Sequence, residues 1–369
     1  MPRFARLRAA EVRDVRPGLA RVTLSDGSEA YALTDLCGPV AAGDELLVNT
    51  SAMDLGLGTG GAHVVHTNLT SPFGGARGPG RVMKARYLAE QLPVEAFEEA
   101  ADGAGTDRPA FVETAPDGAD PREARPADIG LALPSLAGVR VVLCVLHSHA
   151  LALAATVHGV SGEAPGYVMT DSGALPFVLS DLAAACLERG MIATAVSTGQ
   201  AFGAPIEAVT VASGVAALAE RDIQRVVVAP GLGHLGTASP LGFSALDLVG
   251  HAAVLDGLGA ATALVARASS VDERLRHRGV SHHTRAMAAL APTRTVVPVP
   301  ASSKLDPTAG DASWIDALGE RAFRAEPIAV ADALAGSGLS VRSMGRPLES
   351  DEQACLWLGA AAAWLAASA

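Results

Sequence analysis

The sequence predicts an α/β protein with a mainly parallel, doubly wound (Rossmann-like) sheet and a small N-terminal domain similar to a β-barrel. From Val139 onward, short apolar segments recur about every 25 to 36 residues, the length of one strand plus one crossover helix. These segments lack polar alternation, as expected for strands buried on both faces. Residues before position 70 instead alternate apolar and polar side chains around tight turns, which indicates a small β domain.

Residues 1–92 are the predicted β domain with its glycine-rich arm. Residues 19–33 alternate around Asp26 and Gly27, a dipeptide typical of a tight hairpin turn, and a turn at 41–44 precedes a strand at 45–49. A later strand carries His63 and His66. Because residues three apart on a strand face opposite sides, both can point at one ligand only if the strand bulges.

Two glycine-rich passages of this domain offer ligand contacts. The first contains Gly58, Thr59 and Gly60, directly before His63. The second spans residues 71–92 and contains Lys84 between two arginines, a concentration of positive charge in an acidic chain. Either this charge is a solvated helix face, or Lys84 reaches an anionic ligand from the small domain.

Residues 93–130 are acidic and rich in Ala, Pro, Gly and Asp, which predicts a linker or insertion, and residues 131–369 are the predicted Rossmann-like domain. The 369 residues are 49% apolar and can fill a sizeable core. A net charge of −11 argues against a nucleic-acid partner. No segment is typical of a membrane span or a secretory signal, and four dispersed cysteines fit free thiols. We therefore expect a cytoplasmic protein, with a homodimer as the default assembly.

The elements of the α/β domain follow from the apolar pattern. The predicted strands are residues 139–146, 166–170, 191–197, 224–229, 261–266 and 294–300. A helix at 176–189 ends before Gly190, as a helix with a C-terminal glycine cap would, and a helix at 350–366 is expected to pack across the sheet.

Residues 225–259 are central to the prediction, because a buried strand leads into a glycine loop and then a helix. Gly231, Gly233 and Gly236 have the spacing of a dinucleotide-binding loop, but the helix starts late and no acidic residue ends an adjacent following strand. The glycines therefore serve a nucleotide, shape a turn, or line a small substrate together with Thr237. The last of these is the interpretation that we favour.

Ligands of open parallel sheets bind beyond the carboxyl ends of the strands. Polar residues gather at these predicted ends: His147, Ser148 and His149; Asp171, Ser172 and Gly173; Ser197, Thr198, Gly199 and Gln200; Gly231, Gly233, His234 and Thr237; Arg267, Ser269 and Ser270, with His282 and His283 further on. Among them, His147, Asp171 and His234 are the candidate catalytic residues, because His and Asp perform acid–base chemistry or bind metals.

A divalent metal is the only cofactor that the residues suggest. His147 and His149 are two apart, so at a strand end they project to the same side and can bind one ion, with Asp171 or His234 completing the set. Two alternatives stay open. The histidines are either hydrogen-bonded neutral rings at the sheet edge or metal-free acid–base groups, and Asp171 can also be a helix cap.

Two classes of function remain. One is an enzyme acting on a small polar or anionic metabolite in a cleft between the two domains; the other is a non-catalytic sensor that binds a metabolite there. A protein-docking role for the small domain is a third alternative. The Gly-x-Ser-x-Gly motif of a nucleophile elbow does not occur in the sequence.

Three passages resemble a bacterial family of similar length, domain-of-unknown-function family 3866. They are GLGTGGAHVVHTNL (residues 56–69), GRVMKARYL (80–88) and the strand ending in Leu146, His147 and Ser148. The resemblance covers nearly the whole chain. It implies a shared two-part architecture and no activity.

Overall fold

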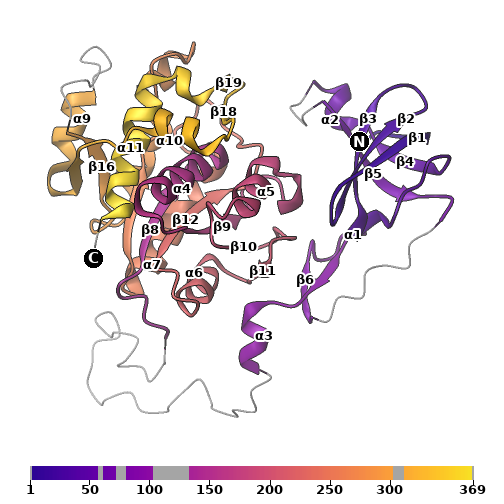
Figure 1. Ribbon diagram of the computed structural model, residues 1–369, viewed down its shortest axis with the longest axis horizontal. Coiled ribbons are helices and arrows are strands. Elements are labelled where there is room, and N and C mark those ends of the chain that lie inside the picture. The colour runs from indigo at the N-terminus through magenta and orange to yellow at the C-terminus, as the bar shows by residue number, and fades with distance from the viewer. Residues whose placement is uncertain (1, 57–60, 72–79, 103–132, 302–310, 368–369) are drawn as a thin grey trace.

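The computed structural model describes residues 2–56, 61–71, 80–102, 133–301 and 311–367. The N-terminal part is a closed barrel with the strand order β1-β2-β3-β5-β4 (Figure 1). Its strands are β1 (Phe4–Arg16), β2 (Leu19–Leu24), β3 (Glu29–Leu33), β4 (Glu45–Asn49) and β5 (His63–Asn68), with short helices α1 (Thr34–Cys37) and α2 (Ser51–Asp54). All neighbouring pairs are antiparallel except β3 and β5. Val22, Leu46 and Val48 are fully buried inside the barrel, which confirms the predicted small β unit.

The arm after the barrel lies against the α/β part. It consists of the hairpin β6 (Val82–Lys84) and β7 (Leu92–Val94) followed by α3 (Phe97–Asp102). Leu92 and Val94 pack on Phe202, and Ala96 forms a parallel bridge with Glu207 at the edge of the sheet. The arm therefore covers one edge of the sheet. Most of the predicted acidic linker, residues 103–132, lies outside the described residues.

The α/β part is built on a parallel sheet in the order β11-β10-β9-β12-β8-β13. Its strands are β8 (Arg140–Cys144), β9 (Gly166–Thr170), β10 (Ala195–Ser197), β11 (Ile206–Glu207), β12 (Arg225–Pro230) and β13 (Ala261–Val265). Five of them were predicted. The edge strand β11 was not, and the predicted last strand forms β16 (Val297–Pro300), which pairs with β17 (Ala322–Ala325) and reaches β13 by a single bridge.

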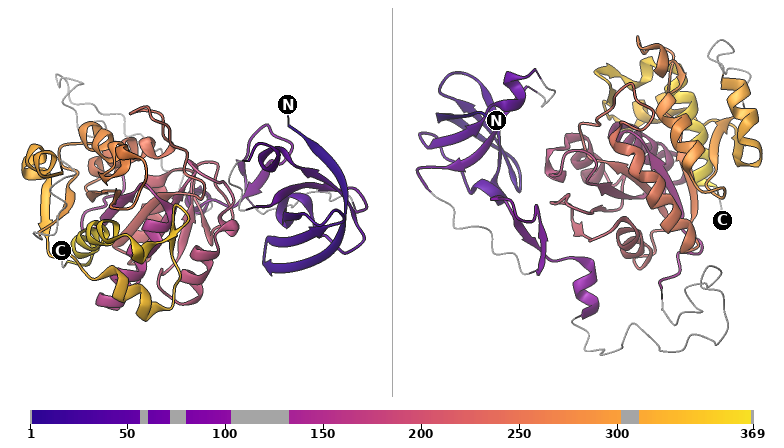
Figure 2. Two further views of the ribbon diagram at one scale, coloured as in Figure 1. Left: turned by 90° about the horizontal axis from the view of Figure 1, so that it is seen from above. Right: turned by 180° about the vertical axis from the view of Figure 1, so that it is seen from behind.

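Successive residues of each strand contribute to two separate cores, which is why the strands are apolar throughout. Val142 belongs to the core beneath α4 (His147–Ser161), α5 (Asp181–Glu188), α10 (Val330–Ser337) and α11 (Glu352–Ala366). Val141 belongs to the core that contacts α6 (Val211–Ala219), α7 (Leu248–Gly257), α8 (His282–Leu290) and α9 (Asp311–Leu318). Figure 2 shows the sheet between these helices.

Short elements complete the structure. They are the pairs β14 (Ala268–Ser269) with β15 (Gly279–Val280) and β18 (Arg342–Ser343) with β19 (Arg346–Pro347), and the 3-10 helices Phe177–Leu179, Ser244–Asp247, Leu275–His277, Gly319–Arg321 and Leu348–Ser350. The barrel contacts the α/β part through Arg16, which donates to the Val178 carbonyl over 2.8 Å and pairs with Asp181. Within the described part of the chain, no helix is long and apolar enough to cross a membrane.

Candidate functional site

His147 begins α4 directly after β8, and its ring nitrogens are both engaged inside the protein. Nδ1 lies 2.8 Å from the Tyr167 hydroxyl and Nε2 lies 2.6 Å from Ser180 Oγ. The residue is 6% exposed, and burial lowers the pKa of the ring to about 4. His147 is thus a neutral, hydrogen-bonded group within the fold, which matches the structural alternative for this residue.

His149 points elsewhere. Both histidines lie in α4, where residues two apart are separated by about 200° around the axis, so the shared projection expected at a strand end does not occur. His149 Nε2 lies 2.9 Å from Ser343 Oγ, and burial lowers the pKa of this ring to about 3. Ser148 between them is half-buried. Among the described residues, no group of three or more His, Cys, Asp or Glu is arranged to hold a metal ion.

Asp171 lies at the end of β9 and binds the neighbouring loop. Its Oδ2 accepts a hydrogen bond of 2.8 Å from the Gln200 backbone N–H, and the carboxylate lies directly beside Gly199. Ser172 donates to Asp247 at the start of α7. Asp171 is therefore held by the backbone of the loop after β10, with a second carboxylate close by.

The serine and threonine that end β10 face inward. Thr198 Oγ1 donates to the Met169 carbonyl, and Ser197 Oγ accepts from the Ala204 N–H. Both residues are at most 1% exposed. Both side chains thus hydrogen-bond within the protein and stabilise the loop.

Two glycines predicted to line a ligand allow two loops to touch. A Cβ at Gly173 would lie 2.4 Å from the Gly231 carbonyl oxygen, and the Ala174 N–H donates to the Leu232 carbonyl. The glycine loop after β12 thus packs on the loop after β9. Further along, Thr237 Oγ1 donates to the Gly242 carbonyl in a local turn.

Lys84 is buried and already occupied. Its Nζ donates to the carbonyls of Gly199 and Ala208 over 2.9 and 3.1 Å and lies 3.4 Å from Glu207. The side chain is fully buried, and burial lowers the pKa of the ammonium group. Through these hydrogen bonds and this ion pair, Lys84 holds the arm against the edge of the sheet. In the barrel, His63 lies on β5, and Gly58, Thr59 and Gly60 lie outside the described residues.

A basic cluster follows β13 and is centred on Arg267, which is 5% exposed. Arg267 lies 3.3 Å from Asp272, but the same carboxylate accepts three hydrogen bonds from Arg274. Burial lowers the pKa of Arg267 to about 10, and Arg274, Arg276 and Arg346 add to the effect. Positive charge therefore exceeds negative charge around this guanidinium group.

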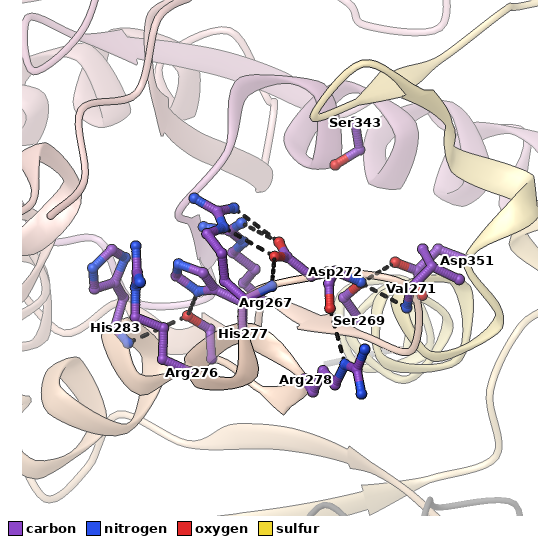
Figure 3. A network of polar contacts seen from close by, with 12 residues as sticks. Arg267, Ser269, Val271, Asp272, Arg276, His277, Arg278, His283, Ser343 and Asp351 are labelled. Carbon is purple, nitrogen blue, oxygen red and sulfur yellow. Dashed lines mark hydrogen bonds and ion pairs between the residues drawn. The ribbon is translucent and has the colours of Figure 1, made fainter. Parts of the chain in front are cut away.

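Four imidazole rings adjoin Arg267. His283 stacks on Phe243 and contacts His234, His277 and His282, with ring centroids 4.1 to 5.9 Å apart. Figure 3 shows His277 and His283 on one side of Arg267 and Asp272 on the other. Burial, assisted by Arg267, lowers the pKa of His234 and His283 to about 4 and that of His277 to about 3, so these three rings are neutral.

Within the described part of the chain, three ring nitrogens of this group are buried without a hydrogen-bond partner. They are His234 Nε2, His282 Nε2 and His283 Nδ1. Buried polar atoms of native proteins are rarely unpartnered, so these nitrogens call for an explanation. A cavity of about 10 Å³ adjoins Arg267, lined also by His149, Ser343 and Asp351.

The three predicted catalytic residues have different hydrogen-bond partners in the structure. His147 contacts Tyr167 and Ser180, Asp171 contacts the loop after β10, and His234 joins the imidazole group with Ser244. The sequence placed His234, Arg267, His282 and His283 at the carboxyl edge but missed Asp272, Arg274, Arg276 and His277. The segment RLRHRGVSHH at residues 274–283, unusually basic for this chain, could have indicated the cluster.

A larger cavity, of about 530 Å³, lies at the opposite, amino edge of the sheet. Arg140 and Arg225 line it, and they donate to the last carbonyls of α11, Trp364 to Ala366. Arginines often bind the carbonyls that a helix end leaves without partners. These two residues are thus explained by holding the C-terminal helix in place.

The fold and the carboxyl edge define a mixed α/β protein with a closed N-terminal barrel, a parallel sheet and a basic histidine-rich cluster at the end of β13. The chain belongs to the family described as "Protein of unknown function (DUF3866)", which matches residues 29–108 and 116–363. This confirms the resemblance noted in the sequence. Comparisons with curated proteins and with solved structures give no match to the chain.

Proposed function

We propose that this protein is an enzyme that binds a small anionic metabolite at the carboxyl edge of a Rossmann-like, doubly wound sheet. The observation that carries the proposal is Arg267, a buried cation whose one ion pair among the described residues, with Asp272, is shared with Arg274. Burying a charge without full compensation is costly, so such a group is retained where a ligand supplies the missing charge. The basic cluster therefore favours a carboxylate or phosphate.

The neutral imidazoles next to Arg267 favour an enzyme over a sensor. A sensor needs only groups that bind, such as amides and arginines, whereas this site also has the titratable rings of His234 and His283 beside Arg267. Burial lowers their pKa to about 4, so they are neutral at physiological pH and would act as weak general bases. The substrate site lies at the end of β13. The barrel contacts the α/β part through Arg16 and is not part of the proposed substrate site.

A cytoplasmic location fits the proposal. All four cysteines, Cys37, Cys144, Cys186 and Cys355, are free, and three of them are buried. Free buried thiols are typical of a reducing compartment, where small phosphorylated and carboxylated metabolites are abundant.

The test is a thermal-shift screen of the purified protein with sugar phosphates and hydroxy acids. A ligand at 100 times its Kd stabilises a protein by about 2.7 kcal/mol, which gives a clear rise in Tm. We expect Arg267→Met to abolish the rise and Arg267→Lys, which keeps the charge without the planar fork, to retain part of it. Arg324→Met, at an exposed arginine of β17, is the matched control and should leave it unchanged.

Two outcomes would contradict the proposal. One is the absence of any stabilising anion. The other is an equal rise in Tm for the wild type and Arg267→Met. Asp272 stays paired with Arg274 in the Arg267 variants, so these variants should fold.

A further inference from the structure

The contacts of His283 show which of its two ring nitrogens is a hydrogen-bond acceptor. Its Nε2 lies 3.2 Å from the Thr237 carbonyl oxygen, which can only accept, so Nε2 bears the proton. Since the ring is neutral, Nδ1 then has a lone pair and no hydrogen. Nδ1 is buried without a partner in a residue that is only 1% exposed. It therefore calls for a hydrogen-bond donor.

His282 Nδ1 lies 3.2 Å from the Arg276 carbonyl oxygen, which can only accept, so this nitrogen donates, and Nε2 is buried without a partner among the described residues. His234 Nδ1 contacts the Ser244 hydroxyl, which can donate or accept. His283 Nδ1 is therefore the nitrogen of this group whose role as an acceptor is fixed by the contacts and the neutral ring.

His234 Nε2 and His283 Nδ1 both lie close to Gly236. A Cβ built on Gly236 would lie 2.8 Å from His283 Cε1, 3.5 Å from His234 Nε2 and 3.7 Å from His283 Nδ1, so the loop at residues 231–243 packs tightly on this ring. The same loop exposes Leu235 and Leu241, 68% and 61% accessible, to solvent. A ligand group can therefore contact His283 Nδ1 only after this loop moves aside, as active-site loops commonly do.

We propose that the anionic ligand of this site is hydroxylated, a hydroxy acid or a polyol phosphate, whose hydroxyl group donates to His283 Nδ1 while its charged group binds Arg267. This inference rests on the proposed function and specifies its substrate class. Neither a carboxylate nor the dianion of a phosphate monoester has a donor for Nδ1, whereas a hydroxyl group has one.

The test compares ligand pairs that differ in hydroxyl groups alone. The probes are glycerol 3-phosphate against n-propyl phosphate and lactate against propionate, with the affinity of each measured by calorimetry on EDTA-treated protein. In the wild type we expect the hydroxylated member to bind about 5- to 10-fold more tightly, the effect of one hydrogen bond to a buried acceptor.

His283→Phe removes the acceptor and keeps the ring stack on Phe243, whose centroid lies 4.1 Å away at an interplanar angle of 13°. We expect the affinity ratio to fall to about 1 in this variant, with the affinity of n-propyl phosphate or propionate retained. His158→Phe, in the last turn of α4, is the matched control and should keep the wild-type ratio. If His283→Phe does not fold, Gly236→Ala replaces it, because its methyl group would overlap His283 Cε1 and displace the ring that carries the acceptor.

The outcomes separate the two proposals. If both members of a pair bind equally to the wild type in an Arg267-dependent manner, the hydroxyl inference is wrong and the anion site stands. If no anion binds, the proposed function is wrong. If added Zn²⁺ raises the Tm of the EDTA-treated wild type but not of His283→Phe, the lone pair serves a metal, which also overturns the hydroxyl inference.

Discussion

His147 makes the stability of this protein depend on pH. Its ring is 6% exposed, and burial lowers its pKa from 6.5 to about 4. Between these two values the unfolded chain takes up a proton that the folded ring does not, so the free energy of unfolding falls as the pH falls. The contribution of His147 is complete above about pH 6.5 and is lost by about pH 4.

The two pKa values set the size of the effect. A shift of one unit corresponds to about 1.4 kcal/mol, so the full contribution of this ring is about 3 kcal/mol. Between about pH 7 and about pH 5, it should lower the free energy of unfolding by about 2 kcal/mol. The hydrogen bonds to Tyr167 and Ser180 hold the ring in place over this range.

His147→Gln removes the titration and keeps a side chain that can hydrogen-bond in the same space. We expect the variant to be about 1 to 2 kcal/mol less stable than the wild type at neutral pH, because one hydrogen bond is lost. Its free energy of unfolding should then decrease by about 2 kcal/mol less on acidification, measured by urea unfolding at several pH values. His158→Gln, at the other end of α4, should follow the wild type. An unchanged pH dependence in His147→Gln would refute the assignment of His147 as a buried neutral ring.

Two further predictions concern the packing of the edge. Lys84→Met leaves Glu207 buried without its cation and should lower the free energy of unfolding by about 3 kcal/mol or more in denaturant titrations, and adding Glu207→Gln should recover part of this loss. Additive losses in the double variant would contradict the pairing. Gly173→Ala should cost about 1 to 3 kcal/mol because its methyl group would meet the Gly231 carbonyl, whereas Gly250→Ala on α7, with open space around it, should be neutral or stabilising by thermal unfolding. Equal stabilities for the two alanine variants would show that the loops can separate.

Much of the fold could be predicted because burial on both faces leaves a direct trace in the sequence. The strand at Arg225–Pro230 is apolar at nearly every position, and the hairpin at Asp26 and Gly27 follows from turn chemistry, with Gly27 at a φ of +84°. The edge strand β11 could not be predicted, because two residues, Ile206 and Glu207, form no recognisable pattern.

The candidate site was harder to predict because it depends on where one element ends. The helix α4 begins at His147, only two residues after β8 ends at Cys144, so His147 and His149 follow helical and not extended geometry. Arg267 meets Asp272 only through the short turn between β14 and β15, and Asp351 reaches Ser269 from more than eighty positions away. Contacts of this kind depend on tertiary packing and cannot be predicted from the periodicity of apolar residues in the sequence.

The edges of the sheet also bear on solubility. Unpaired strand edges are templates for association between molecules, and a barrel that closes on itself presents none. Ala96 shields β11 on one side, and Val296 bridges to β13 on the other. A chain shortened to begin after the arm would lose the Ala96 bridge and leave β11 as an unpaired edge strand. We expect such a chain to aggregate during expression, even though the hydrophobic cores on the two faces of the sheet are retained.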